Sequence, residues 1–165
     1  MTRPTVAKPQ VGPRNAGAGH SRVTGVRGVF TSLDAAQTEE LGARLAARLR
    51  PGDVVLVAGE LGAGKTTFVR GACRRLGVPG PVTSPTFTIG QRYPAAVPVG
   101  HVDLYRVASL ADEDPDLLAD YLGPDAIGFV EWPLGEEPTL AGLGRIVARV
   151  SLEHAGGGRR RVEVR

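Results

Sequence analysis

Residues 53–76 decide the fold, and they read DVVLVAGELGAGKTTFVRGACRRL. The stretch predicts a strand over residues 53–58, because a continuous apolar and β-branched run is typical of a strand buried in the centre of a sheet. A glycine-rich loop follows, and residues 66–76 then predict a helix that Gly77 ends. The order strand, glycine-rich loop, helix predicts an α/β domain organised around a phosphate-binding loop.

The loop from Gly59 to Thr66 matches the pattern G-x-x-x-x-G-K-[ST] in full. Its glycines allow backbone N–H groups to point at phosphate oxygens, and the helix behind it adds the positive end of its dipole. We expect Lys65 to bridge the β- and γ-phosphates of ATP and Thr66 to bind Mg²⁺ through its hydroxyl. The predicted ATP-binding residues are Gly59, Leu61, Gly62, Ala63, Gly64, Lys65 and Thr66.

Lysine usage also favours a phosphate site. Lys8 and Lys65 are the only lysines among the 20 basic residues, so the chain uses arginine almost everywhere else. A compact ammonium on a flexible stem fits a tight backbone cradle in which a planar guanidinium is too wide.

The remaining patterns predict a first strand, a helix capped by Asp34, two strands joined by a Pro-containing turn, a second helix that starts at Asp114, a further strand and a terminal hairpin. The first strand is expected at residues 26–31, the capped helix at 34–49, and the two strands joined by the turn at 87–93 and 97–105. The second helix is expected at residues 114–122, the further strand at 126–132, and the terminal hairpin at 145–153 with 160–164.

Length and composition are those of one globular domain. The chain has 165 residues and a net charge of +3, and its first five basic residues all precede its first acidic one, Asp34. We therefore expect a flexible basic tail over residues 1–28 and a near-neutral domain over residues 29–165, which weakens a nucleic-acid-binding interpretation. A single cysteine, no apolar run of membrane-spanning length and no secretory signal predict a cytoplasmic protein.

Two carboxylates end apolar runs and are candidates to organise the metal. Glu131 follows residues 127–130, and Asp103 follows residues 97–102. A carboxylate that ends a buried strand is costly unless it is paired or faces a site, and the alternative is a surface acid just past the strand. Trp132 is either a core residue or part of the site, whereas His101 is interpreted as a structural residue satisfied by a hydrogen bond.

A Pro-stiffened segment, Ser84-Pro85-Thr86-Phe87-Thr88, follows the loop behind the predicted helix. The hydroxyls of Ser84 and Thr86 could face the γ-phosphate as a switch does, and ordinary turn chemistry is the alternative.

Several segments together resemble the bacterial ATPase family of tRNA threonylcarbamoyladenosine biosynthesis, the TsaE type. Over about residues 30–165 the matching pieces are Thr38 with Leu41-Gly42, the loop continued through Thr67-Phe68, residues 84–88, residues 101–106 (His-Val-Asp-Leu-Tyr-Arg) and residues 130–133 (Val-Glu-Trp-Pro). The loop alone is generic, and the last three pieces in this order are specific. The long basic tail departs from the family pattern.

The resemblance implies a small P-loop NTPase fold with a mixed parallel and antiparallel sheet flanked by helices. It implies Mg²⁺-dependent ATP hydrolysis that supports N6-threonylcarbamoylation of adenosine 37 in tRNAs reading ANN codons. The implied partners are the threonylcarbamoyl transferase (TsaD type), its inactive paralogue (TsaB type) and, through that complex, tRNA. It also implies that Thr67 lies at the nucleotide, that Glu131 is the magnesium carboxylate, and that Asp103 serves hydrolysis or metal organisation. Trp132 is expected near the site, and Thr38, one of the matching pieces, is a possible switch or site-lining residue.

Three other functions share the loop. A small-molecule kinase needs an acceptor site and usually an Arg-bearing lid, and no clear lid insertion is present. A GTPase normally reads guanine with an N-K-x-D segment, which is absent because Asn15 in the tail is the only asparagine. A nucleotide-dependent assembly module overlaps with the family interpretation.

Overall fold

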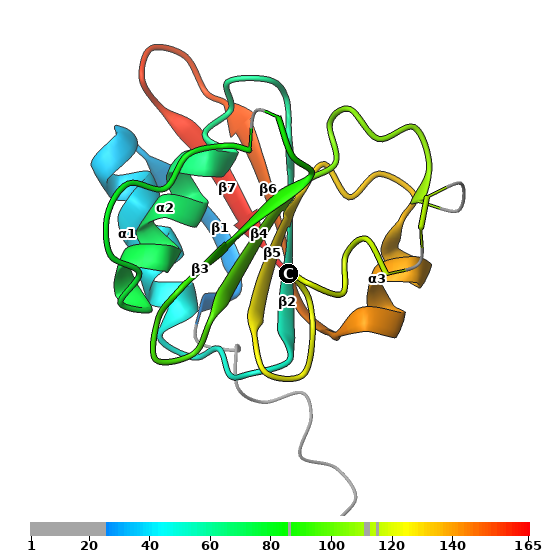
Figure 1. Ribbon diagram of the computed structural model, residues 1–165. Helices are drawn as coiled ribbons and strands as arrows, with labels where there is room; N and C mark the ends of the chain where they lie inside the picture. Colours follow the sequence, from blue (N-terminus) through cyan, green and yellow to red (C-terminus); the bar gives the residue numbers. More distant parts are fainter. Residues whose placement is uncertain (1–25, 86, 111–112, 115) are drawn as a thin grey trace, which may run out of the picture.

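A computed structural model of the chain describes residues 26–85, 87–110, 113–114 and 116–165. Seven strands form one sheet in the order β1-β7-β6-β2-β5-β4-β3 (Figure 1). The strands are β1 (Gly28–Ser32), β2 (Asp53–Gly59), β3 (Gly90–Tyr93), β4 (Val99–Asp103), β5 (Ile127–Glu131), β6 (Arg145–His154) and β7 (Arg160–Val164). The helices are α1 (Ala35–Ala46), α2 (Lys65–Arg75) and α3 (Glu137–Leu143).

The sheet is mixed, as expected. Strand β2 is central and pairs in parallel with β5 and with β6, and β5 pairs in parallel with β4. The edges are antiparallel, because β3 pairs with β4, and β7 pairs with both β6 and β1. The predicted terminal hairpin is therefore confirmed, and the two strands that flank the Pro-containing turn pair antiparallel.

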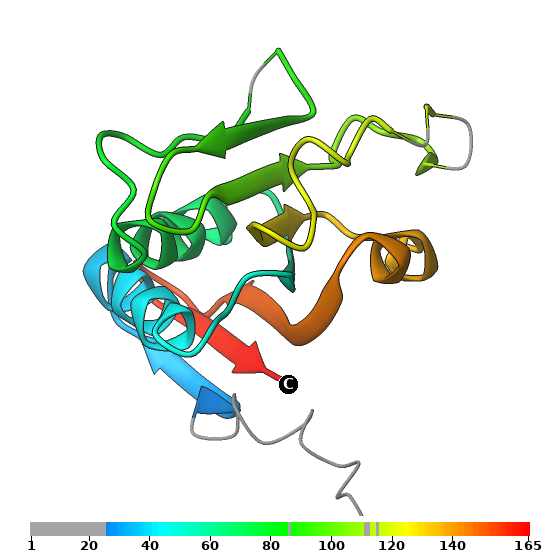
Figure 2. The same ribbon diagram turned by 60° about the horizontal axis from the view of Figure 1, so that its bottom comes forward.

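Helices cover both faces of the sheet. Figures 1 and 2 show α1 and α2 packed side by side on one face and α3 on the other. Strand β2 serves both layers, since Val55 and Val57 pack on the side of α1 and α2 while Val54 and Leu56 pack on the opposite side. All four side chains are at most 2% exposed, as predicted for a central strand.

Helix α1 begins where the capping pattern predicts, with the Asp34 carboxylate accepting a hydrogen bond of 2.8 Å from the Gln37 N–H. It ends at Ala46, three residues before the predicted end. Glycines let α1 and α2 approach closely, because a Cβ on Gly42 would lie 2.1 Å from the carbonyl oxygen of Phe68. The small residues of α1 thus serve close packing against α2.

The predicted helix over residues 114–122 is wrong. The described part of this segment consists of turns, with i→i+3 hydrogen bonds such as Tyr121 N–H to the Leu118 carbonyl at 3.0 Å. Leu118 and Leu122 are buried, and the Tyr121 backbone lies directly on the sheet, where a Cβ on Gly100 would be 1.9 Å from its carbonyl oxygen. Close packing of this segment on Gly100 of β4 therefore outweighs the local sequence preference for a helix.

Other predicted elements differ at their boundaries. The strand predicted over residues 87–93 covers only Gly90–Tyr93, and Phe87 is 97% exposed. Helix α3 was not predicted, because it has seven residues and only Leu140 is buried in it. Residues 1–25 lie outside the described residues, so the tail over residues 1–28 and the domain over 29–165 stay predictions. Within the described ranges, no helix is long and apolar enough to cross a membrane.

Candidate active site

The site lies where three parallel strands end. The glycine-rich loop follows β2, Glu131 is the last residue of β5, and Asp103 is the last residue of β4. In the sheet register Glu131 pairs with Val57 of β2 on one side and with Asp103 on the other. Parallel strands therefore bring the two candidate carboxylates side by side, at the edge where open α/β sheets bind ligands.

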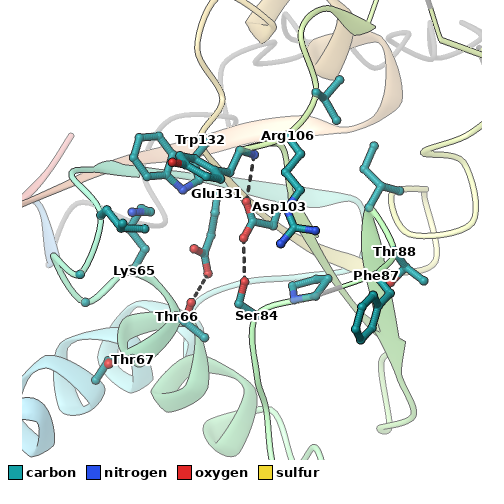
Figure 3. Close-up of a pocket in the computed structure, with 17 residues that line it drawn as sticks. Lys65, Thr66, Thr67, Ser84, Phe87, Thr88, Asp103, Arg106, Glu131 and Trp132 are labelled. Atoms are coloured by element: carbon teal, nitrogen blue, oxygen red, sulfur yellow. Dashed lines mark hydrogen bonds between the residues drawn. The ribbon is translucent and has the colours of Figure 1, made fainter.

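A cavity of about 620 Å³ opens at this edge (Figure 3). Ten of the predicted site residues line it: Leu61, Gly62, Gly64, Lys65, Thr66, Thr67, Ser84, Asp103, Glu131 and Trp132. The cavity is also lined by Pro85, Phe87, Thr88, Ile89, Tyr105, Arg106 and Val107. Thr86 lies outside the described residues.

Three predicted residues do not line the cavity. Gly59 and Ala63 contribute backbone, since Gly59 offers its carbonyl to Lys65 and Ala63 is fully buried. Thr38 lies in α1, 1% exposed, with its hydroxyl 2.8 Å from the Ser32 hydroxyl. Its methyl group would be 3.8 Å from a Cβ on Gly64, so Thr38 supports the loop from behind.

Lys65 is held beside the loop by three contacts. Its Nζ donates hydrogen bonds of 2.9 Å to the carbonyls of Gly59 and of Glu60, and it lies 3.9 Å from the centroid of the Trp132 ring. Burial lowers the pKa of Lys65, whereas the negative charges of Glu131 and Asp103 oppose that shift. The ammonium thus faces two carboxylates across the cavity.

Glu131 is the most enclosed acid of the site, only 2% exposed. Its Oε1 accepts a hydrogen bond of 2.9 Å from the Thr66 hydroxyl and lies 2.8 Å from Nε2 of His101 (Figure 3 shows the first). His101, predicted as a structural residue satisfied by a hydrogen bond, therefore makes that bond to a candidate catalytic carboxylate.

Asp103 anchors the Pro-stiffened segment. The Ser84 hydroxyl donates to its Oδ2 at 2.7 Å, and the Tyr105 N–H donates to its Oδ1 at 3.0 Å. Ser84 is thereby attached to Asp103 at the end of β4, and Pro85, Phe87 and Thr88 also line the cavity (Figure 3).

The donor set suits Mg²⁺. A hydroxyl and two carboxylates supply only oxygen, the ligand type that Mg²⁺ prefers. Among the described residues there is no group of three or more His, Cys, Asp or Glu side chains that could hold a metal ion. The fit is therefore to an ion held with the help of nucleotide phosphates and water rather than in an all-protein cage.

Trp132 has a strained backbone. Its φ of 56° is the only positive value at a non-glycine position among the described residues, and its N–H donates to the Val57 carbonyl at 3.1 Å. Its ring lies 4.9 Å from that of Tyr105, centroid to centroid. Strain of this kind persists where the surroundings enforce it, and here it turns the indole over Lys65.

Phe87, Tyr105 and Arg106 line the cavity, although no local motif marks them individually as site residues. Phe87 lies in the strand predicted over residues 87–93, Tyr105 ends the strand predicted over residues 97–105, and Arg106 follows without a pattern of its own. All three belong to segments that carry the family resemblance, and that was the available signal.

The chain is similar to known proteins in sequence and in fold. The family model described as "Threonylcarbamoyl adenosine biosynthesis protein TsaE" matches residues 32–162. The chain is 50% identical over 104 residues to the tRNA threonylcarbamoyladenosine biosynthesis protein TsaE of Streptomyces coelicolor, a match that covers 61% of this chain and 70% of the relative. It is 41% identical over 105 residues to the protein of that name from Bacillus subtilis, with 62% and 65% covered.

A solved structure has a similar fold. The crystal structure of Bacillus subtilis YdiB superposes with a TM-score of 0.63 at 28% sequence identity, and the match covers 82% of each chain. The likeness extends well beyond the glycine-rich loop and includes most of the described domain.

Proposed function

The chain belongs to the TsaE family of threonylcarbamoyl adenosine biosynthesis proteins, and we propose that it is the ATP-binding and ATP-hydrolysing subunit of that process. It has a role in tRNA threonylcarbamoyladenosine biosynthesis. The finer proposal is that hydrolysis supports N6-threonylcarbamoylation of adenosine 37 in tRNAs that read ANN codons, in the cytoplasm. The buried lone Cys73, whose pKa burial raises to about 12, suits a reducing compartment.

One observation carries the proposal. The Thr66 hydroxyl donates to Glu131 at 2.9 Å, which joins the phosphate loop of β2 to a carboxylate at the end of β5, with Lys65 beside them. Burying the Glu131 carboxylate to 2% exposure beside the loop costs free energy. A role in binding and hydrolysing a nucleotide explains why the carboxylate is found at this position.

Each residue then has a defined role. The N–H groups of the loop bind the phosphates, and Lys65 leaves its two carbonyl partners for the β- and γ-phosphates. Thr66 and Glu131 would hold Mg²⁺, which neutralises phosphate charge when it is bound. Glu131 keeps the Thr66 hydroxyl oriented, and Asp103 keeps Ser84 at the same cavity.

The proposed partners are the threonylcarbamoyl transferase and its inactive paralogue, with tRNA reached through their complex. Leu61, Phe87 and Tyr105 line the cavity and are 72%, 97% and 57% exposed. Large apolar side chains left open around a site support its completion by another protein. We therefore expect slow hydrolysis by the isolated chain and faster hydrolysis with the transferase pair.

The test is phosphate release from ATP without any small-molecule acceptor, which also separates this function from a kinase. Wild type, Lys65→Ala and Glu131→Gln are compared alone and with the transferase pair. We expect Lys65→Ala to lose on the order of a thousandfold in rate, because the phosphate-bridging charge is gone. Glu131→Gln should hydrolyse poorly yet still bind nucleotide.

Two results would contradict the proposal. ATP turnover at the wild-type rate by a folded Lys65→Ala protein would show that the phosphate loop is not required for hydrolysis. Fast turnover by the isolated wild type that ignores the transferase pair would argue against a role in that complex. An unaffected Glu131→Gln would move the metal role to Asp103.

A further inference from the structure

The outer side of the phosphate loop is held by the C-terminal hairpin. Arg160, the first residue of β7, donates from Nε to the Ala63 carbonyl at 3.0 Å and from Nη2 to the Gly62 carbonyl at 3.3 Å. His154, which pairs with Arg160 across the hairpin, lies 3.4 Å from the Leu61 carbonyl through Nε2. The Arg160 side chain thus forms hydrogen bonds to two consecutive carbonyls of a loop that lies nearly a hundred residues earlier in the sequence.

The direction of these carbonyls fixes the direction of the N–H groups that follow them. In a trans peptide the C=O of one residue and the N–H of the next point in opposite directions. With the Ala63 carbonyl turned to Arg160, the Gly64 N–H points away from Arg160, and Gly64 lines the cavity. The guanidinium therefore orients an N–H donor of the loop without itself lining the cavity.

The loop needs such a restraint because its glycines permit other orientations. Gly62 and Gly64 have φ values of 74° and 99°, in the region that glycine enters at little cost. The Gly62–Ala63 peptide plane is also fixed by the Ala63 N–H, which donates to the Glu60 carbonyl at 3.1 Å, whereas the Ala63–Gly64 plane can rotate when nothing holds the Ala63 carbonyl. An anion-binding nest requires successive N–H groups on one side of the chain.

We infer that Arg160 is a positioning residue that presets the phosphate loop for the β-phosphate of the nucleotide. The inference rests on the proposed ATP-binding function and adds a residue to it. Arginine suits the role because its planar fork reaches two carbonyls at once, which a lysine ammonium on a flexible stem does less well. A third bond, from Nη1 to the Arg159 carbonyl at 2.9 Å, holds the fork in place.

A matched control lies one residue away. Arg161 is on the same strand and forms ion pairs at 3.4 Å with Glu153 and at 3.5 Å with Glu163, away from the loop. Arg161→Met removes the same charge and a similar volume as Arg160→Met. The two variants therefore separate the contact with the loop from the loss of one positive charge.

The experiment measures binding by calorimetry to the full chain in EDTA, with ADP as the probe and adenosine as the ligand without phosphates. For Arg160→Met we expect ADP affinity to fall about tenfold, the effect of losing one or two net hydrogen bonds that order the loop. Arg161→Met should stay within about twofold of wild type, because exposed ion pairs contribute little. Arg160→Lys should remain weaker than wild type, and adenosine binding should not change.

Thermal unfolding of each variant shows whether the fold is intact, and a purely structural role would lower the unfolding midpoint without selective loss of ADP. Failure of wild type to bind ADP would overturn the proposed function and this inference with it. ADP binding by Arg160→Met at wild-type strength, an equal loss in Arg161→Met, or full recovery in Arg160→Lys would overturn the inference alone.

Discussion

Replacing His101 by leucine should impair ATP hydrolysis far more than it destabilises the fold. His101 is fully buried in β4, and its Nε2 lies 2.8 Å from Oε1 of Glu131. An ionised Glu131, which the proposed magnesium role requires, only accepts at Oε1, and in that state Nε2 of His101 is the donor. The opposite ring nitrogen, Nδ1, is buried and has no hydrogen-bond partner among the described residues.

The magnitude follows from these two nitrogens. Losing a hydrogen bond to a charged group costs about 1.5–3 kcal/mol, and removing a buried unpaired polar atom returns about 1–3 kcal/mol. The two largely offset, so His101→Leu should change the free energy of unfolding by no more than about 1–2 kcal/mol. For a chain of this size that shifts the midpoint by about 2–4 °C per kcal/mol.

For the rate of ATP hydrolysis, nothing in His101→Leu offsets the loss of the contact between His101 and Glu131. Glu131 keeps only the Thr66 hydroxyl as a hydrogen-bond donor to Oε1, so its orientation toward the proposed Mg²⁺ site is less well defined. Losing a partner that orients a metal-site side chain typically costs about 10–100-fold in metal affinity or activity. We therefore expect a loss of that size, with a higher Mg²⁺ concentration needed for half-maximal rate.

The assay is phosphate release at saturating ATP with the transferase pair present, at several Mg²⁺ concentrations. His101→Gln is the control, since its amide can donate from about the position of Nε2, and it should recover most of the rate. A wild-type rate in His101→Leu would refute the reasoning. So would equal impairment of both variants, because the effect could not then be assigned to the donated hydrogen bond.

Two further predictions concern the packing of the sheet and the N-terminal segment. Gly100→Ala should strongly destabilise the protein in chemical denaturation, by about 3 kcal/mol or more, because its Cβ would lie 1.9 Å from the Tyr121 carbonyl oxygen. Gly142→Ala, in α3 with open space around the new methyl group, should be neutral or slightly stabilising. Deleting residues 1–25 should leave ATP affinity unchanged in calorimetry, because that segment has little apolar content with which to form part of a site. A large loss of affinity would show that the tail contributes to nucleotide binding.

Local patterns in the sequence predicted what depends on local physics. The apolar run of β2, the glycine-rich loop and the cap at Asp34 each encode their structure within a few residues, and all three are found where expected. The same patterns predicted Glu131 and Asp103 as site carboxylates, because a carboxylate at the end of a buried strand costs free energy unless it is paired or faces a site. Both line the cavity with the loop.

Tertiary packing decided the rest. The sequence of residues 114–122 favours a helix, yet the described residues of this segment form turns because the Tyr121 backbone packs directly on Gly100. The partners of Glu131 and of the loop come from distant strands, His101 from β4 and Arg160 from β7. No periodicity relates residues that far apart, because their contact depends on the strand order of the sheet. The sequence by itself determined that a phosphate loop exists here, and only the folded sheet determined which side chains orient it.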